Sequence, residues 1–220
     1  MCARSAQGAK RKRSPRGSGE QLADEILAAA TDLLLEHGGP DGVSIRAVAT
    51  RVGVTPPSIY LHFTDKDELL DAVCAHFFEQ FDEVMMDVSV HHDDIVERGI
   101  AQGLAYVRFA LANPVMYQSA FVRTADQPTR TDLVLMSSAF QHFGETVAAA
   151  MDSGLLPRGD VAAMTLRLWS SAHGVASLIT SKPGLPWGDP MQVAEDVLRA
   201  TLRGFSQESV KSEQAESDGR

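Results

Sequence analysis

Apolar residues of this chain recur with the spacing of an α-helix, and glycine or proline interrupts the pattern at intervals. The first such stripe is Leu22, Ile26, Ala29, Ala30, Leu33 and Leu34. Gly38 and Gly39 follow it, and glycine readily takes the left-handed conformation that ends a helix, so we expect a first helix over about 20–37. No segment alternates between apolar and polar residues as a half-buried strand does. The pattern predicts an all-α protein.

Two short helices are predicted next. Ser44 is a candidate N-cap for a helix over 45–52, which Gly53 ends. Thr55 is a candidate N-cap for a second one that has two prolines in its first turn and ends near Leu61. Two short helices joined by a glycine-containing turn form the pattern of a DNA-reading helix-turn-helix, although such pairs also occur in ordinary helical bundles.

The rest of the chain continues with helical spacing. We expect a long fourth helix over about 66–88, followed by helices over 93–112, 114–122, 129–153, 160–180 and 190–206. Asp189 and Pro190 supply the cap and the first residue of the last helix. The expected organisation is a flexible basic arm at 1–19, a three-helix bundle at 20–65, a larger helical domain at 66–206 and a disordered tail at 207–220.

Charge is unevenly distributed along the chain, whose net charge is −9. Residues 1–70 hold nine basic and nine acidic residues, whereas residues 71–220 hold eleven and twenty. Six of the bases precede the first acidic residue, Glu20, and so form a short cationic arm. Such an arm can contact DNA phosphates, or it can simply be a solvated tail.

Several classes of protein are excluded by what the sequence contains. The uncharged stretch 168–181 is too short and too polar to cross a bilayer, and 1–16 lacks the apolar run of a secretory signal, so we expect a cytoplasmic protein. Cys2 and Cys74 make neither a disulfide framework nor a metal set, and His91, His92, Asp93 and Asp94 are interpreted as a solvated loop. No nucleophile elbow or phosphate loop occurs, so we expect no catalytic residue, no cofactor and no enzyme activity.

Several runs of residues in the N-terminal third of the chain together resemble the DNA-binding domain of TetR-family transcriptional regulators. It consists of Ile26-Leu27-Ala28-Ala29-Ala30, then Val43-Ser44-Ile45-Arg46-Ala47-Val48-Ala49, then Gly53-Val54 followed by Ile59-Tyr60-Leu61-His62-Phe63, and lastly Lys66. The resemblance covers about 22–73 and implies a DNA-binding helix-turn-helix.

The resemblance assigns roles to individual residues of this segment. Tyr60 and Lys66 face DNA phosphates, Ser44 and Thr55 cap their helices and also reach phosphates, and Ile59 and Phe63 are core residues. A Tyr60 packed in the bundle and a solvated Lys66 are the alternatives. Bases are expected to meet Pro56, Pro57, Ser58 and Leu61, with His62 near the DNA backbone and Arg46 on the preceding helix. This set is apolar enough to contact thymine methyl groups, so Arg46, Ser58 and the arm are expected to carry the polar readout.

A second, shorter resemblance lies near the C-terminus. The run Leu166 to Leu178, which includes Trp169, His173 and Gly174, is similar to the Trp-His-Gly domain of one TetR-family branch. The resemblance implies that the helices at 160–180 and 190–206 form a homodimer interface, which also suits a protein that reads two half-sites of a palindrome. Alternatively, their apolar stripes only fill the core of one chain.

Aromatic and methionine residues between these segments are typical of a pocket lining. The candidates for binding a small, apolar or aromatic effector are Phe109, Met116, Tyr117, Phe121, Met136, Phe140, Phe143, Trp169 and His173. Taken singly, His173 is interpreted as a hydrogen-bonded core histidine. The function expected from the resemblance is a dimeric repressor that binds a palindromic operator in double-stranded DNA and is released by the effector. Activation instead of repression, a helical protein-interaction module and an all-α enzyme are the alternatives.

Overall fold

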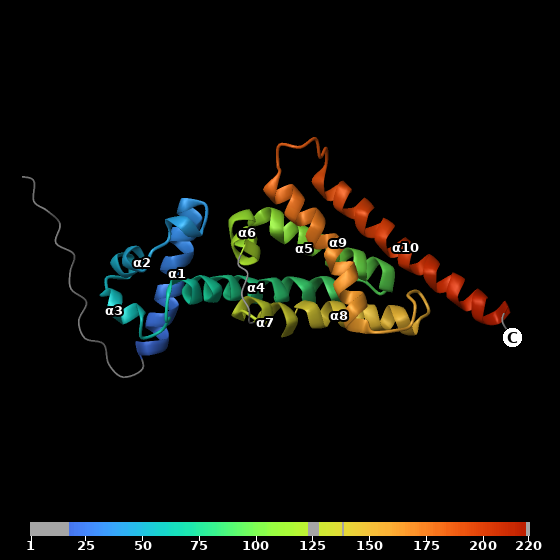
Figure 1. Cartoon of the computed structure of the whole chain (residues 1–220), viewed down its shortest axis with the longest axis horizontal. Helices are drawn as coiled ribbons and strands as arrows, with labels where there is room; N and C mark the ends of the chain where they lie inside the picture. Colours follow the sequence, from blue (N-terminus) through green and yellow to red (C-terminus); the bar gives the residue numbers. More distant parts are fainter. Residues whose placement is uncertain (1–17, 123–127, 138, 219–220) are drawn as a thin grey trace, which may run out of the picture. The chain divides into compact units, whose positions relative to one another are not determined.

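The computed structural model describes residues 18–122, 128–137 and 139–218, and helices are the only regular elements in these ranges (Figure 1). The all-α prediction is therefore confirmed for the described residues. The predicted arm at 1–19 lies almost entirely outside them. The chain divides into two compact units, Met1–Cys74 and Ala75–Arg220, so the first unit includes the beginning of the long helix that the sequence analysis assigned to the second domain.

The first unit is a bundle of short helices around a small core. Its elements are α1 (Ser18–His37), the 3-10 turn η1 (Pro40–Gly42), α2 (Ile45–Val52), α3 (Pro56–Ile59) and the first turns of α4 (Lys66–Val90). The fully buried side chains include Ile26, Ala30, Leu34, Val48, Ile59 and Leu69. The predicted glycine stop of α1 is confirmed, because Gly38 has a φ of 71° and the Gly39 N–H donates to the Leu34 carbonyl at 3.1 Å.

The turn between α2 and α3 has the predicted cap and stop, but α3 is shorter than expected. The Ser44 hydroxyl accepts a hydrogen bond from the Ala47 N–H at 3.2 Å, and Gly53 ends α2 with a φ of 78°. α3 ends at Ile59, and Tyr60 and Leu61 lie in the turn that follows. Two prolines occupy the first turn of α3, where an N–H group has no partner within the helix, so they are compatible with its start.

The second unit contains the rest of α4 together with six further helices. They are α5 (Ile95–Ala112), α6 (Pro114–Val122), α7 (Arg130–Ser137), α8 (Ala139–Asp152), α9 (Val161–Ser181) and α10 (Pro190–Asp218). The helix predicted over 129–153 is thus divided into α7 and α8, with residue 138 outside the described ranges. α5, α9 and α10 pack against one another in pairs, and a Cβ on Gly103 of α5 would meet Leu198 of α10 at 2.8 Å.

Aspartate side chains cap three helices of this unit. Asp94 accepts from the Glu97 N–H at 2.9 Å at the start of α5, and Asp160 accepts from two N–H groups at the start of α9. Asp189 accepts from the Met191 N–H at 2.9 Å, which confirms the entry predicted for α10. A carboxylate there satisfies N–H groups that have no partner within the helix and complements the helix dipole.

The prediction of a disordered tail at 207–220 is wrong for 207–218, because α10 continues to Asp218. Neither proline nor glycine occurs between residues 205 and 218, and Glu, Gln, Lys and Ala in this segment are good helix formers. The lack of an apolar stripe in 207–220 therefore does not by itself indicate disorder. None of the described helices combines the length and the apolar character needed to cross a membrane.

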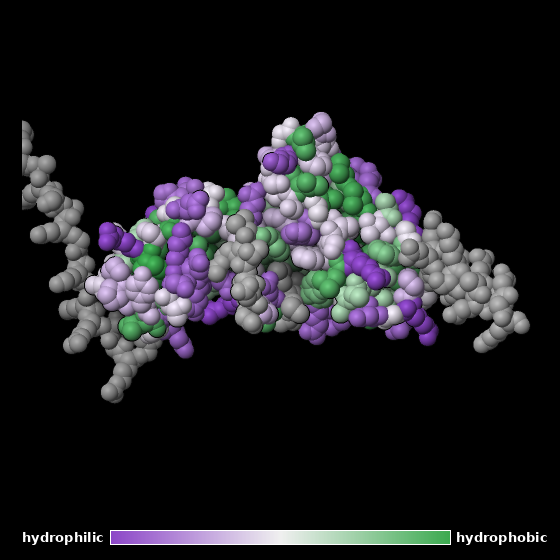
Figure 2. Space-filling model, in the orientation of Figure 1, coloured by the Kyte–Doolittle hydropathy of each residue, from purple (hydrophilic) through white to green (hydrophobic). Residues whose placement is uncertain are grey.

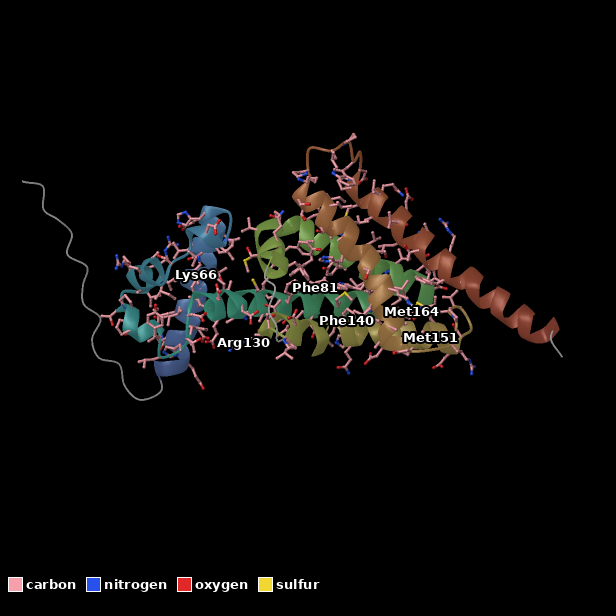
Figure 3. All side chains as sticks on the ribbon, viewed as in Figure 1. Lys66, Phe81, Arg130, Phe140, Met151 and Met164 are labelled. Carbon is pink, nitrogen blue, oxygen red and sulfur yellow. The ribbon has the colours of Figure 1, made fainter. Side chains whose placement is uncertain are left out.

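One hydrophobic cluster joins the ends of α8 and α9. Its buried members are Val147, Ala150, Met151, Leu156 and Met164. Met151 from α8 and Met164 from α9 lie near each other in Figure 3, whereas Phe81 and Phe140 lie further along α4 and α8. The cluster closes one end of the space that these helices surround.

Candidate functional site

The turn after α3 presents two large side chains to solvent above a buried anchor. Leu61 is 84% exposed and Tyr60 is 53% exposed, while Ile59 is completely buried and Phe63 is 3% exposed. The prediction that Ile59 and Phe63 are core residues is confirmed. Because the buried Ile59 and Phe63 hold the turn in place, the exposed side chains of Tyr60 and Leu61 keep a fixed direction. Fixed exposed side chains are suited to binding another molecule.

The remaining predicted contacts of α3 lie on the same short segment. Pro57 is exposed, and Pro56 and Ser58 are half-buried. Thr55 stands at the N-cap position, but the prediction that its side chain caps α3 is wrong. The Thr55 hydroxyl instead pairs with the Ser58 hydroxyl at 3.1 Å, because Pro56 and Pro57 remove the N–H groups nearest to it.

The two arginines of α2 have different surroundings. Arg51 forms a bidentate ion pair with Glu36 of α1, with N–O distances of 2.8 and 2.6 Å. The hydrogen bond from Arg51 holds the pKa of the Glu36 carboxyl below its ordinary value. Arg46 is exposed and lines a shallow depression with Leu33, Ser44, Ala47, Thr50 and Arg51. Arg51 therefore ties α2 to α1, while Arg46 extends from the exposed face.

Lys66 is the first residue of α4 and is half-buried (Figure 3). The helix start is capped reciprocally: Asp65 accepts from the Glu68 N–H, and Glu68 accepts from the Thr64 N–H, both at 2.7 Å. This arrangement fixes the first turn that carries Lys66. His62 is half-buried, and its ring lies 6.5 Å from that of Phe63.

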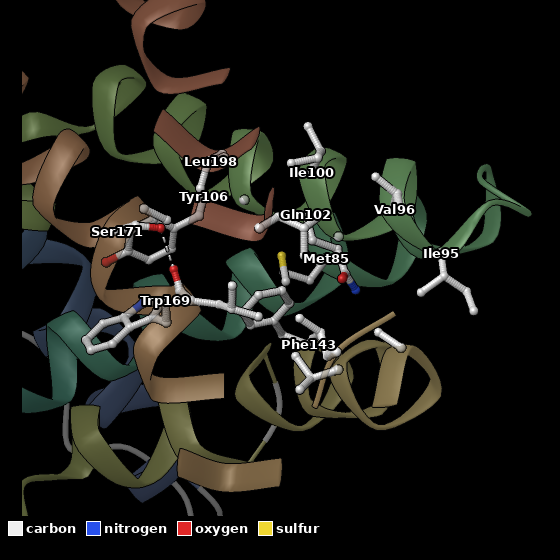
Figure 4. A pocket seen from close by; sticks show the side chains of 18 of the residues that line it. Met85, Ile95, Val96, Ile100, Gln102, Tyr106, Phe143, Trp169, Ser171 and Leu198 are labelled. Atoms are coloured by element: carbon white, nitrogen blue, oxygen red, sulfur yellow. Dashed lines mark hydrogen bonds between the residues drawn. The ribbon is translucent and has the colours of Figure 1, made fainter. Parts of the chain in front are cut away.

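The second unit encloses an apolar cavity of about 70 Å³ between α4, α5, α8, α9 and α10 (Figure 4). It is lined by Phe81 and Met85 of α4, by Ile95, Val96, Gly99, Ile100, Gln102, Gly103 and Tyr106 of α5, by Phe140, Phe143, Val147 and Ala150 of α8, by Leu155 and Leu156, by Leu168, Trp169, Ser171 and Ala172 of α9, and by Leu198 and Leu202 of α10. None of these described lining residues carries a charge. The cavity has the composition of a site for an apolar molecule.

The predicted effector residues divide between this cavity and its surroundings. Phe140, Phe143 and Trp169 line the cavity. The others, Phe109, Met116, Tyr117, Phe121 and His173, are not among its lining residues, and the side chain of Met136 lies outside the described part of the chain. These five residues therefore do not line this cavity: Tyr117, Phe121 and His173 pack with one another in an adjoining aromatic cluster. Phe109 packs against Phe77, Phe78 and Phe81 of α4, and Met116 is buried.

The aromatic cluster contains a hydrogen-bonded group of two tyrosines and a histidine. The Tyr106 hydroxyl donates to the Tyr117 hydroxyl at 3.3 Å, and the two hydroxyls lie 2.9 and 2.8 Å from Nδ1 of His173. Burial raises the pKa of Tyr106 and raises that of Tyr117 to about 12, and it lowers the pKa of His173. All three groups are therefore held in their uncharged forms. The interpretation of His173 as a hydrogen-bonded core histidine is confirmed.

The sequence analysis missed the wall that α5 contributes to the cavity. Gly99 and Gly103 are one helical turn apart; Gly99 faces Thr146 of α8, and Gly103 lets Leu198 of α10 approach closely. Gln102 is completely buried among apolar residues. A glutamine next to glycines spaced by four, in a helix rich in apolar residues, was the available signal.

Large apolar side chains also remain at the surface of this unit. On α9, Leu166 is 50% exposed and Leu178 is 53% exposed, and Leu185 in the following loop is 52% exposed. Figure 2 shows hydrophobic residues at the surface where α9 ends and α10 begins.

The described residues contain no group of three side chains able to hold a metal ion.

Two family models match the chain. The model described as bacterial regulatory proteins, tetR family, matches residues 26–73, which contain α2, α3 and the exposed turn. The model described as tetracyclin repressor-like, C-terminal domain, matches residues 100–210, which is half of the chain.

A curated relative also resembles this chain in sequence, over a shorter segment. The chain is 38% identical over 90 residues to the HTH-type transcriptional repressor Rv3405c of Mycobacterium tuberculosis, a match that covers 41% of this chain and 46% of that protein. This chain therefore spans less than half the length of that relative.

Solved structures establish the fold along most of the chain. A protein of unknown function from Rhodococcus sp. RHA1 has a TM-score of 0.67 at 24% identity and covers 84% of this chain and 94% of its own. The regulator FadR of Bacillus subtilis, in complex with stearoyl-CoA, has a TM-score of 0.67 at 16% identity and covers 82% and 98%. With one family model on the helix-turn-helix and another on half of the chain, the protein belongs to the TetR family of bacterial regulatory proteins.

Proposed function

We propose that the protein is a ligand-responsive, DNA-binding transcriptional repressor. The observation that carries this proposal is the turn after α3, where Leu61 is 84% and Tyr60 is 53% exposed above the buried Ile59. This turn lies inside the segment that matches the tetR-family model. A segment of this kind fits the major groove, which is wide enough to admit an α-helix.

The DNA contacts divide by chemistry into phosphate and base contacts. Tyr60 donates its hydroxyl to a phosphate, and Lys66 neutralises one. Leu61 and the ring of Pro57 meet thymine methyl groups, and Arg46 supplies polar contacts from α2. The full set is Ser44, Arg46, Thr55, Pro56, Pro57, Ser58, Tyr60, Leu61, His62 and Lys66, and the basic arm at 1–19 adds further phosphate contacts.

The protein acts as a homodimer through α9 and α10. Leu166 and Leu178, both about half exposed in the single chain, support this proposal because leucines of this kind pack well against a second copy. A two-fold dimer reads a palindromic operator when its reading helices lie about 34–36 Å apart. Size-exclusion chromatography with light scattering tests the dimer, and a stable monomer at micromolar concentration contradicts it.

A small apolar effector releases the repressor by binding in the cavity of the second unit. FadR of Bacillus subtilis, which shares the fold, was solved in complex with stearoyl-CoA, a ligand with a long apolar acyl chain and a charged CoA group, so this fold can hold a ligand with a large hydrocarbon part. α4 begins in the first unit and continues into the second, where Phe81 and Met85 line the cavity. A hundredfold loss of operator affinity requires an effector that prefers the released arrangement by about 2.7 kcal/mol.

The remaining parts of the proposal follow from the same family assignment. The second unit belongs to the Trp-His-Gly branch in this proposal, which the stretch with Trp169, His173 and Gly174 supports and which is finer than the match to the family model. The chain works in the cytoplasm, has no enzymatic activity and needs no cofactor.

The alternative is a helical module that binds a protein partner and not DNA. Fluorescence anisotropy with labelled duplexes from the DNA flanking its own gene discriminates between the two functions. The native chain binds one such duplex in the nanomolar range, while Tyr60→Ala/Leu61→Ala binds it at least tenfold more weakly with an unchanged melting temperature. If the native chain binds no duplex at low salt, the DNA-binding function is wrong and the interaction module takes its place.

A further inference from the structure

We propose that the cavity takes an uncharged, mostly hydrocarbon ligand that carries one hydrogen-bonding group, and that the carboxamide of Gln102 recognises this group. The inference rests on the proposed function, because it specifies the effector of the same cavity. It is based on the lining, its polar groups and the size of the space.

The lining contains no ionised side chain among the described residues. Its residues are apolar apart from Gln102, Tyr106 and Ser171. Moving an ionised carboxylate or amine from water into such a space costs several kcal/mol when no opposite charge compensates it. A ligand that enters the cavity is therefore neutral, at least in the part that it buries.

Two of the three polar lining groups form hydrogen bonds within the protein. The Ser171 hydroxyl donates to the Leu168 carbonyl at 2.7 Å. The Tyr106 hydroxyl donates to Tyr117 and lies within hydrogen-bond distance of His173, away from the cavity. A ligand group that used either hydroxyl would have to compete with these bonds.

Gln102 is placed to meet a ligand in the middle of the lining. Figure 4 shows it beside Met85, with Trp169 at one end of the cavity and Ile95 at the other. The residue is completely buried on α5. A carboxamide offers two N–H donors and two lone pairs, so it can serve a protein neighbour and a ligand at the same time. A ligand hydroxyl or carbonyl gains a hydrogen bond here that pure hydrocarbon lacks.

The size of the cavity indicates that the ligand has to widen it. Its volume is about 70 Å³. A cavity of about 150 Å³ is known to admit benzene, so even one aromatic ring requires the walls to move apart. Binding of this kind favours a different arrangement of the surrounding helices, as the proposed release from DNA requires.

The test uses three probes that differ in one substituent: propylbenzene, 4-propylphenol and 4-propylbenzoate at pH 8. Trp169 lines the cavity and reports binding by its fluorescence. The other tryptophan, Trp187, lies between α9 and α10 and donates to the Lys182 carbonyl, so Trp187→Phe provides a background with a single reporter. We expect 4-propylphenol to bind about threefold to tenfold more tightly than propylbenzene, the ratio for one net hydrogen bond. The benzoate is expected to bind at least tenfold more weakly than the phenol.

Gln102→Leu tests the recognition residue in the same background. It is expected to bind propylbenzene as the native cavity does and to lose the preference for 4-propylphenol, so that the ratio of the two dissociation constants falls to about one. Retained binding of propylbenzene shows that the cavity is intact. Thr165→Val is the matched control, because Thr165 is buried on α9, bonds to the Val161 carbonyl and does not line the cavity. Should Gln102→Leu fail to fold, Gln102→Met is compared in the same way.

The proposal is overturned if the benzoate binds as tightly as the phenol, if no probe binds the native chain, or if the phenol preference persists without the carboxamide. Operator binding by the same proteins is measured separately. If the probe experiment fails while operator binding is intact, the proposed ligand class is wrong and the proposed function is unaffected. Selective phenol binding by a chain that binds no DNA overturns the proposed function and leaves the ligand class standing.

Discussion

The Tyr117 hydroxyl of α6 lies 2.8 Å from Nδ1 of His173 on α9. Tyr106 of α5 completes the group, so three helices of the second unit meet at one set of polar atoms. The rings of Phe121 and Trp169 lie 4.5 and 5.0 Å from the imidazole and limit its access to water. The neutral imidazole accepts a hydrogen bond there, whereas protonation would place a charge among aromatic rings.

His173 is expected to make the stability of the protein depend on pH. Burial lowers its pKa below the ordinary value of 6.5, so between that value and the lowered one the unfolded chain binds a proton that the folded chain does not. Stability from this group is therefore complete above pH 6.5 and is lost as the pH falls through this window. Urea unfolding at pH 8 and pH 5 measures the loss.

His173→Asn separates this effect from the titration of the other histidines. Asparagine can still accept a hydrogen bond near the position of Nδ1, but it does not titrate. The variant is expected to lose less stability than the native chain between pH 8 and pH 5, whereas His76→Asn, on the exposed face of α4, behaves as the native chain does. Equal losses in the native chain and His173→Asn would falsify the assignment.

Gly103 is expected to tolerate alanine less well than Gly99 one turn earlier. A Cβ on Gly103 would lie 2.8 Å from Cδ1 of Leu198, while the nearest atom to a Cβ on Gly99 is Cγ2 of Thr146 at 3.8 Å. Gly99→Ala is expected to be neutral or to stabilise α5 by up to about 1 kcal/mol. Gly103→Ala is expected to be less stable than Gly99→Ala by about 1–3 kcal/mol, because overpacking displaces α10. Urea denaturation compares the two, and equal stabilities contradict the close approach of α5 and α10.

Lys66→Ala is expected to weaken operator binding without changing its sequence preference. One phosphate contact fewer lowers the slope of log K against log salt by about one unit. Anisotropy titrations between 50 and 200 mM KCl measure this slope. Lys182→Ala, an exposed residue of the second unit, serves as the control with an unchanged slope. If both variants keep the native slope, Lys66 is a solvated first-turn lysine.

Leu61 is expected to read thymine methyl groups. Replacing every thymine of the operator by uracil removes these methyl groups and is expected to weaken binding by the native chain. Leu61→Ala is expected to show a smaller preference for the thymine duplex than the native chain, because only the contact from Pro57 remains. Since the side chain of Leu61 is 84% exposed, the free energy of unfolding changes by no more than about 0.5 kcal/mol. A variant that keeps the full native preference shows that Leu61 makes none of these contacts.

Local chemistry within the sequence determined the helical class, the helix starts and the anchored helix-turn-helix. The caps at Ser44 and Asp189 and the stops at Gly38 and Gly53 depend on neighbours within a few residues, so they are visible in the chain itself. The burial of Ile59 and Phe63 follows from helical spacing in the same way. The predicted cap by Thr55 was wrong because Pro57 lacks an N–H that such a cap could use, and α3 ends at Ile59, two residues before the predicted end.

Only the tertiary structure decided which side chains surround the cavity. Phe121 and Phe143 are equally apolar in the sequence, yet Phe121 packs edge-to-face against His173 while Phe143 lines the cavity. The tyrosine–histidine bond spans 56 residues, and Gly103 and Leu198 meet only because α5 and α10 pack together. Periodicity tells which face of a helix is buried, but the partner of that face depends on how distant helices pack, and a single helix carries no record of that packing.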